Sequence, residues 1–476
     1  MQKRHIFCIS ALLCGSLLQA QSLQEAKNLF KNNEFEKAKP AFEQLVKKVP
    51  GNASYNYWYG ACCYETGEKE KAEKYLKFGA KKKIQEAFRY LGQLYFDFYR
   101  YEESVENYES YLEMLEKGKK TTEKAEAAIE RSKLASRLLK GVEKVTVVDS
   151  FVVDKDKLLE VYEISPESGA LFTYNEYFNQ KGEHPGMVYV TEMKNKLFYC
   201  DNASGNLDIY QRDKQLTDWG KASKLSETVN TEANENYPYV LSDGITLYYA
   251  SDGQGSIGGY DIFVTRYNTN TNKYLMPENI GMPFNSPAND YLFVLDEFNN
   301  LGWFASDRYQ PEGKVCVYVF IPNTSKETFS FENDDHDMIR SRARIQSIED
   351  TWTDRNEVKA AVQRLTKARY DKPKTQVNHA FEFVIDDNTV YFEENHFRCA
   401  EAKKLFKQWQ QKQGDLQKLQ ANLEALRKKY SSAKAADKQT MASSIIDQEQ
   451  RAEQLEAELE QMPMTIRNTE LKYLSK

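Results

Sequence analysis

Apolar and polar positions follow three different spacings along this chain, and each spacing predicts a different kind of structure. Residues 21–141 carry small and aromatic residues at helical spacing. Residues 145–325 carry short aromatic and β-branched runs that alternate with Gly, Asn and Asp turns, which predicts antiparallel strands. Residues 398–463 carry leucines every three or four positions, as coiled-coil helices do. We therefore expect a multidomain protein that contains both α and β domains.

The helical region contains an internal repeat with four marked positions in each copy. The three copies place at the same offsets Ala26, Leu29, Ala38 and Phe42, then Gly60, Cys63, Ala72 and Leu76, then Gly92, Tyr95, Ser104 and Tyr108. Small residues let two antiparallel helices approach closely, and large residues fill the space between them. The pattern resembles the signature of tetratricopeptide repeats. A further helix over residues 121–140 is expected to cap the stack.

This resemblance implies an α-helical solenoid over residues 21–141, whose concave face binds a peptide or a helix of a partner protein. A purely structural role, as a spacer between domains, is the alternative that the residues leave open.

Three segments of the strand-rich region can be superimposed. They are KLFYCDNASGNLDIYQRD, TLYYASDGQGSIGGYDIFVTRY and LGWFASDRYQPEGKVCVYVFIP, and each is expected to form strand, polar connection, strand. The first two agree further along, because Leu225, Asn230, Asn234 and Glu235 recur at one constant spacing as Ile280, Asn285, Asn289 and Asp290. A period of about 50 residues made of antiparallel strands predicts blades of a β-propeller.

The fragment ASDGQGSIGGYDIF resembles the TolB-type, WD-repeat-like propeller repeat of bacterial envelope proteins. That resemblance implies a central antiparallel β-propeller over residues 145–325. We expect a fourth, divergent blade within residues 145–174, and the number of blades stays open.

The second segment also contains a G-x-G-x-x-G motif. Its glycines have the spacing of a dinucleotide-binding loop, but a strand follows them instead of the helix that a pyrophosphate needs. We interpret the glycines as turn residues with positive φ, and the aspartates as acceptors for turn N–H groups. A calcium loop is the alternative, although the EF-hand spacing is absent. The repeat positions are Ser251, Asp252, Gly253, Gly255, Gly258, Gly259 and Asp261.

Composition argues against several classes of function. The 476 residues carry 65 Lys and Arg against 71 Asp and Glu, a formal net charge of −6, so we expect no nucleic-acid partner. Neither the cysteines nor the histidines have metal-ligand or disulfide spacing; they include Cys62, Cys63, Cys200, Cys316, Cys399, His184, His336, His379 and His396. No nucleophile and base stand at a recognisable spacing. We expect no catalytic residues, no cofactor and no metal.

Residues 1–20 have the plan of a secretory signal peptide. MQKRH precedes the apolar stretch IFCISALLCGSLL, and Ala20 supplies a small residue for cleavage. The apolar stretch is shorter than the roughly 20 residues that span a bilayer, and no later stretch is apolar enough. We therefore expect an exported protein, periplasmic or peripheral to the outer membrane.

The C-terminal region contains three further patterns. Residues 334–370 are expected to be helical with a break at TWTD, and residues 379–393 to form a β-hairpin that either joins the propeller or stands alone. Residues 398–463 are expected to form two coiled-coil helices, the second ending at Pro463. An antiparallel hairpin within one chain is the default for these helices, and a dimerising coiled coil is the alternative. The oligomeric state stays open.

The order of signal peptide, tetratricopeptide repeats and propeller resembles envelope proteins of the Bacteroidetes type. In those proteins the modules often precede a peptidoglycan-binding domain like that of outer-membrane protein A, which helices replace here. The resemblance implies a non-enzymatic scaffold that binds protein partners, within an envelope secretion or assembly complex. A propeller that senses or carries a glycan or peptide is the alternative, and a hydrolase is a distant third.

Overall fold

The computed structural model describes residues 23–203, 205–215, 219–371, 383–386, 389–391, 396–433 and 435–474. The chain divides into two compact units, Met1–Lys372 and Pro373–Lys476, which are described separately. The signal peptide expected over residues 1–20 lies outside the described residues, as do His379 and parts of the 379–393 segment.

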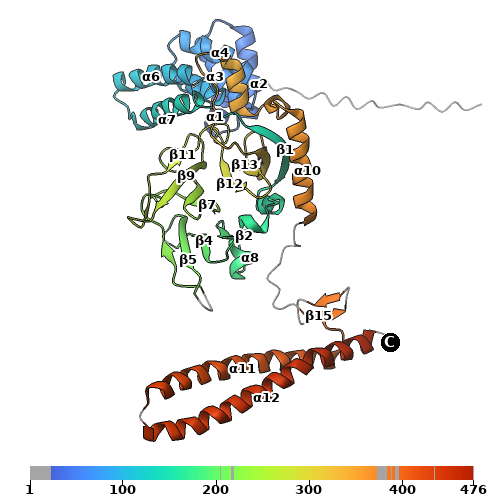
Figure 1. Cartoon of the computed structure of the whole chain (residues 1–476). Helices are drawn as coiled ribbons and strands as arrows, with labels where there is room; N and C mark the ends of the chain where they lie inside the picture. The colour runs from blue at the N-terminus through green and yellow to red at the C-terminus, as the bar shows by residue number, and fades with distance from the viewer. Residues whose placement is uncertain are drawn as a thin grey trace, which may run out of the picture. The chain divides into compact units, whose positions relative to one another are not determined.

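Helices follow one another at the start of the first unit, and each packs against the next (Figure 1). Their bounds are α1 (Leu23–Lys31), α2 (Phe35–Lys48), α3 (Ala53–Glu65), α4 (Lys69–Lys81), α5 (Gln85–Asp97), α6 (Tyr101–Lys117) and α7 (Glu123–Leu139).

The small residues of the repeat lie where these helices cross. A Cβ atom on Gly60 would stand 3.0 Å from Leu76 Cγ, and one on Gly92 would stand 2.8 Å from the Tyr108 ring. Of the other repeat positions, Leu29 is partly exposed and the rest are buried; the buried ones are Ala26, Ala38, Phe42, Cys63, Ala72, Leu76, Tyr95, Ser104 and Tyr108. The four-position pattern therefore marks the contacts between paired helices.

Three antiparallel sheets follow in the described part of the first unit. The first sheet contains β2 (Ala170–Thr173), β3 (Met187–Val190), β4 (Lys196–Asp201), β5 (Asp208–Asp213) and β6 (Ser223–Lys224), with the short helix α8 (Tyr174–Phe178) after β2. The second contains β7 (Glu235–Val240), β8 (Thr246–Ser251), β9 (Asp261–Asn268), β10 (Lys273–Tyr274) and β11 (Glu278–Asn279). The third contains β12 (Asp290–Asp296), β13 (Leu301–Ser306), β14 (Lys314–Ile321) and β1 (Thr146–Asp154).

The prediction of a fourth blade within residues 145–174 is wrong. β1 pairs antiparallel with β14, from Thr146 opposite Ile321 to Asp154 opposite Lys314, and β2 joins the first sheet. Short 3-10 turns connect these two strands, η1 (Lys155–Val161) and η2 (Pro166–Ser168). The edge of β14 would otherwise expose unpaired backbone groups, so pairing with β1 outweighs the formation of a separate sheet.

Asparagines at the spacing of the strand repeat make the same hydrogen bonds in two sheets. Asn230 Oδ1 accepts from Ile209 N at 2.7 Å, and Asn285 Oδ1 accepts from Ile262 N at 2.7 Å. Asn234, before β7, donates through its backbone N and its Nδ2 to Asp252, which follows β8. Asn289, before β12, donates in the same way to Asp307, which follows β13. The repeat spacing therefore reflects these asparagine side chains. They link the connections that precede β7 and β12 to the neighbouring hairpins.

The three sheets share one hydrophobic core. Tyrosine hydroxyls link β3, β7 and β12, which we call the inner strands. Tyr189 donates to Val240 O at 3.0 Å, Tyr239 donates to Leu295 O at 2.5 Å, and Tyr162 donates to Leu292 O at 2.6 Å. These bonds connect the first sheet to the second, the second to the third, and the segment after η1 to the third.

Helices α9 (His336–Arg344) and α10 (Arg355–Asp371) complete the first unit, with η3 (Glu349–Thr351) at the expected break. Trp352 Nε1 donates to Val147 O at 2.7 Å, and α10 packs against β1 and β13.

The second unit is a helical hairpin with a small sheet. Helices α11 (Ala400–Ser432) and α12 (Ala435–Leu474) pack against each other, and strands β15 (Phe383–Asp386) and β16 (Thr389–Tyr391) pair antiparallel. Gln420 Nε2 donates to Glu456 Oε1 at 2.9 Å and Arg427 pairs with Glu449, so the helices run antiparallel. Strand β15 packs on α12.

The prediction that the second helix ends at Pro463 is wrong, because α12 continues to Leu474. Beyond the proline, Ile466 and Glu470 are fully buried. The Glu470 carboxylate accepts hydrogen bonds from Tyr391 Oη at 3.0 Å, Arg398 N at 2.6 Å and Cys399 N at 3.1 Å, at the start of α11. These contacts outweigh the roughly 3 kcal/mol that a proline costs inside a helix.

Gly92→Ala should destabilise the helical repeats. The added methyl group would press on the Tyr108 ring, and overpacking of about 1–3 kcal/mol exceeds the helix-propensity gain of about 1 kcal/mol. Urea unfolding measures the change, with Gly51→Ala as the control, since nothing lies within 4 Å of that Cβ. Equal stability of the two variants would contradict this account of the crossing.

Glu470→Ala should destabilise the second unit by about 2–3 kcal/mol, because three donors lose a charged acceptor in a buried place. Proteolysis of the full chain, followed by mass spectrometry of the α11–α12 peptides, reports the change. The exposed Glu460 provides the matched control, Glu460→Ala. Unchanged protection of these peptides in Glu470→Ala would show that other contacts carry α12 past Pro463.

Candidate functional site: the joint between helices and sheets, and the cleft beside it

A buried apolar cluster joins the helical repeats to the sheets. Phe96, Tyr99 and Tyr101 from the α5–α6 corner pack with Ile257 from the β8–β9 connection and Ile339 from α9. Ile257 is fully buried, and burying such a side chain contributes about 1.5–3 kcal/mol. We call this cluster the joint. Because it is continuous from α5 to the sheets, the repeats and the sheets form one packed body.

The glycine-rich connection holds Ile257 in the joint through Asp261. The Asp261 carboxylate accepts from Ile257 N at 2.9 Å, Gly258 N at 3.0 Å and Asn279 Nδ2 at 2.7 Å. A Cβ atom on Gly258 would stand 1.7 Å from Ala288 O, so only glycine fits there. The glycine-rich connection thus holds one apolar side chain, that of Ile257, in the joint.

The expectation of positive φ holds for only one of the four glycines. Gly255 has φ of +97°, whereas Gly253, Gly258 and Gly259 do not have positive φ. Gly259 is needed for close approach, since its Cβ would stand 2.1 Å from Asn289 Oδ1. The sequence pattern could not separate these two reasons for glycine, because close approach depends on a segment in the next repeat.

Ser251 and Asp252 make structural hydrogen bonds. Ser251 Oγ donates to Glu235 Oε1 at 2.9 Å. Asp252 accepts from Asn234 N at 2.8 Å and from Asn234 Nδ2 at 2.9 Å. Together with Asp261, these residues satisfy the backbone and side chains of the turns around the second sheet.

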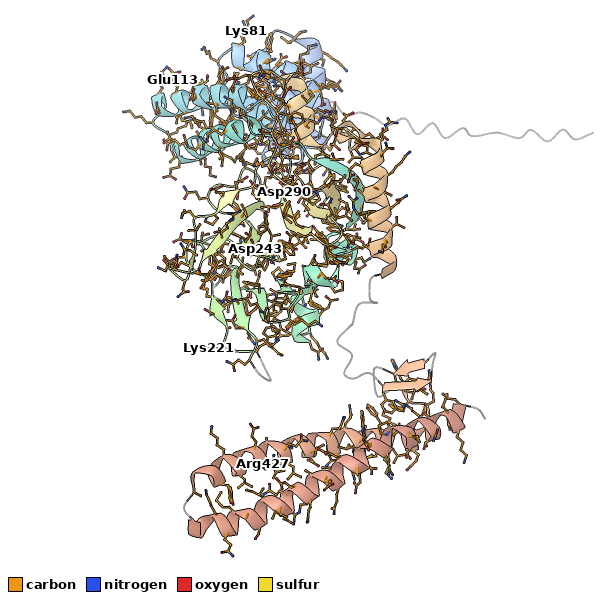
Figure 2. The ribbon with its side chains drawn as sticks, viewed as in Figure 1. Lys81, Glu113, Lys221, Asp243, Asp290 and Arg427 are labelled. Carbon is orange, nitrogen blue, oxygen red and sulfur yellow. The ribbon has the colours of Figure 1, made fainter. Side chains whose placement is uncertain are left out.

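Two buried aspartates lie beside the joint, and only Asp290 has an ion-pair partner among the described residues. Arg308 pairs with Asp290 at 2.7 Å, and both side chains are almost completely buried. Figure 2 shows Asp290 among the strands next to the helical repeats. Asp261 is also fully buried, and burial, with a smaller contribution from the Asp290 charge, raises the pKa of Asp261 to about 8. Burial therefore favours the protonated form of Asp261.

A cleft of about 630 Å³ opens beside the joint, between the helical repeats and α9. Its lining is mostly charged and comprises Glu70, Phe98, Arg100, Glu103, Asp337, Arg340, Ser341, Arg344 and Gln346.

The three arginines of the cleft differ in their partners. Arg100 donates to Glu73 Oε1 at 3.0 Å and to Glu103 Oε2 at 2.7 Å, and Arg340 pairs with Asp337. Arg344 Nε lies 3.4 Å from Tyr309 Oη, and in the described part of the chain Arg344 forms no ion pair. Arg344 is therefore the cation that the cleft can offer to an acidic group.

Sequence reasoning missed this cleft because its residues come from two distant segments. Arg100 follows α5, whereas Arg340 and Arg344 lie on α9, beyond the whole sheet region. No spacing along the chain marks them. A mixed pattern of Arg and Asp on α9 also fits an ordinary solvated helix face.

Four of the cysteines are buried in the fold, and His184 packs against a tyrosine ring. Cys62, Cys63, Cys200 and Cys316 are buried free thiols, and burial raises the pKa of Cys62 to about 12, far from reactivity near pH 7. His184 stacks on Tyr174 at 3.7 Å between ring centres. Within the described residues, no three His, Cys, Asp or Glu side chains are grouped to hold a metal ion. The described helices are all too short or too polar to cross a membrane.

Comparison with known proteins identifies the N-terminal helices. Residues 23–78 match the model of the tetratricopeptide repeat family. Among solved structures, the tetratricopeptide repeat domain of Sgt2 from Aspergillus fumigatus is similar, with 24% identity over 23% of this chain and 73% of that chain, and a TM-score of 0.21. No curated protein matches the chain. The family match over residues 23–78 shows tetratricopeptide repeats in the N-terminal region, and such repeats are typically protein-binding modules.

Asp261→Asn should reduce the pH dependence of folding. The pKa of Asp261 is raised from 3.8 to about 8 in the folded chain, so the folded state holds the proton more tightly. This contribution to stability is full below pH 3.8 and is lost as the pH rises through about 8, with a slope of at most about 1.4 kcal/mol per pH unit.

Urea unfolding from about pH 5 to pH 8 measures this slope. Asp243→Asn is the control, because the pKa of Asp243 is lowered by hydrogen bonds from Thr246 and Ile245 against the opposing effect of burial, and its contribution changes only at lower pH. A slope in Asp261→Asn equal to that of the parent chain would show that another group carries it.

Proposed function

We propose that this protein is an exported, non-enzymatic scaffold of the cell envelope that holds protein partners, within a secretion or assembly complex. The observation that carries the proposal is the set of tetratricopeptide repeats, packed against the sheets through the joint and bordered by an open cleft. A partner bound to the repeats is then held in a defined position next to the sheets.

The three sheets are proposed to act as blades of a propeller-like ring. Three observations support this arrangement. The inner strands are bonded from sheet to sheet through Tyr189 and Tyr239, and the Asn230 and Asn285 bonds repeat at blade-like spacing. In addition, β1 completes the sheet of β14, so the first and last strands of the region meet. Such a ring presents connecting loops as a second surface for partners.

The cleft is the proposed docking place for an acidic segment of a protein partner. Arg344 offers a guanidinium without an ion pair in the described residues, and carboxylates bind guanidinium groups through two parallel hydrogen bonds. Phe98 lines the cleft, and Tyr309, which is 61% exposed, lies next to Arg344. These rings provide apolar contact around the charged pair.

Export is proposed from the basic, apolar and small-residue order of residues 1–20. A chain processed after Ala20 begins at Gln21, and the helical repeats begin shortly afterwards at Leu23.

Arg344→Glu should abolish capture of the partner without unfolding the protein. The experiment places a photo-crosslinking amino acid at position 341 of the tagged full chain and identifies crosslinked proteins from envelope extracts by mass spectrometry. Crosslinks should form in the parent chain and be lost in Arg344→Glu, because the reversed charge repels an acidic segment. The exposed Arg355 supplies the control, Arg355→Glu, which should keep the crosslinks.

The same spectra report the N-terminal peptide of the tagged protein, expected to begin at Gln21. Crosslinks that survive Arg344→Glu unchanged would contradict the cleft as the docking place. A chain that retains residues 1–20 and fractionates with the cytosol would contradict the envelope location.

A further inference from the structure

Three tyrosines from the second and third sheets lie close together. Tyr237 lies in β7, Tyr260 immediately before β9, and Tyr291 in β12. Their ring centres are 5.5 Å apart for Tyr237 and Tyr291, 6.1 Å for Tyr260 and Tyr291, and 6.3 Å for Tyr237 and Tyr260. Tyr291 is buried, whereas Tyr237 and Tyr260 are partly exposed. We call this group the tyrosine cluster.

Tyr237 is held in a strained backbone conformation. Its φ is +58°, a region that costs a residue other than glycine about 1–3 kcal/mol. The strain falls where the pairing of β7 with β8 shifts register, and the side chain of Asn236 fixes the bend by accepting from Tyr237 N at 2.8 Å and donating to Pro185 O at 2.8 Å.

β12 shifts register at the matching place, between Tyr291 and Val294, without a positive φ at either residue or between them. The register shift alone therefore does not require the strain. A strained residue other than glycine persists only where the surrounding structure fixes it, and such residues cluster at functional sites. Here the strained backbone places the Tyr237 side chain in the cluster.

Lys155 adds a cation to the tyrosine cluster. Its Nζ donates to Tyr291 Oη at 2.9 Å and lies 4.4 Å from the centre of that ring. Lys155 as a whole is exposed, but partial burial of its ammonium lowers its pKa, with a smaller opposing effect from Asp307. Among the described residues Lys155 forms no ion pair. Lys155 is exposed, so its ammonium can reach an anion from solvent beside the Tyr291 ring.

Asp307 is not an ion-pair partner of Lys155. Its carboxylate accepts from Asn289 N at 2.8 Å, Asn289 Nδ2 at 2.8 Å and Tyr291 Oη at 2.9 Å. The hydroxyl groups of Tyr237 and Tyr260, by contrast, form no hydrogen bond within the described part of the chain. The cluster thus combines one cation with two free hydroxyl donors and the faces of aromatic rings.

We propose that the tyrosine cluster binds a ligand that presents a carboxylate beside an apolar face. Lys155 Nζ pairs with the carboxylate, the Tyr237 and Tyr260 hydroxyls donate to the polar groups next to it, and the rings cover the apolar face. An acidic sugar and the free C-terminus of a peptide share this chemistry. The site is separate from the cleft and goes beyond the proposed scaffold function.

Calorimetric titration of the full chain distinguishes the two sources. Trigalacturonate is compared with its neutral methyl ester, and an N-acetylated tripeptide with a free C-terminus is compared with its amide. At least one carboxylate form should bind, and its neutral form should bind about tenfold more weakly or worse. The form that binds identifies the source. Equal binding of charged and neutral forms, or no binding of either acid at about 1 mM, would overturn the proposal.

Substitutions locate the binding. Lys155→Met keeps the aliphatic stem but removes the charge, and it should weaken binding of the acid about tenfold or more. Tyr237→Phe removes only a hydroxyl group and should weaken binding severalfold. Lys221→Met, at the outer edge of the first sheet in Figure 2, is the matched control and should not change the affinity. Full affinity in both Lys155→Met and Tyr237→Phe would place the ligand elsewhere and overturn the proposal.

Discussion

The burial of Ile257 against the α5–α6 corner is the contact on which the arrangement of the first unit depends. The side chain comes from a turn, and a turn has little apolar surface of its own to anchor it. The Asp261 carboxylate fixes this turn by accepting hydrogen bonds from two consecutive backbone N–H groups, including that of Ile257. The helical repeats and the sheets are therefore joined through the Ile257 side chain, which the hydrogen bonds to Asp261 hold in place.

Burial of the Asp261 carboxylate is unfavourable for its charged form, and the groups around it reflect this. Asp261 is buried near Asp290, and in the described part of the chain only Arg308 is buried with them as a counter-charge. Arg308 contacts Asp290 directly, so Asp261 depends on N–H donors, and burial raises its pKa. The connection could not carry a larger residue at Gly258, because the Ala288 carbonyl occupies that space. The glycine spacing of a nucleotide-binding loop is thus produced here by packing and turn geometry.

The sequence allowed some features to be predicted because they repeat or are local. The small and large positions from Gly60 to Tyr108 mark helix crossings, and asparagines at the spacing of the strand repeat make matching bonds. Features that depend on distant partners could not be predicted in this way. β1 pairs with β14 across the whole sheet region, α12 passes Pro463 because Glu470 caps the start of α11, and the cleft combines Arg100 with Arg344.

Hydrogen exchange of the full chain, resolved by segment and followed with increasing denaturant, tests the joint most directly. Peptides from α5–α7 and from β7–β14 should share one opening free energy, and Ile257→Ala should lower the protection of both by a similar amount, because the joint couples them. Loss of protection in the helices alone, with the sheets unchanged, would contradict the account that one buried cluster makes the repeats and the sheets a single body.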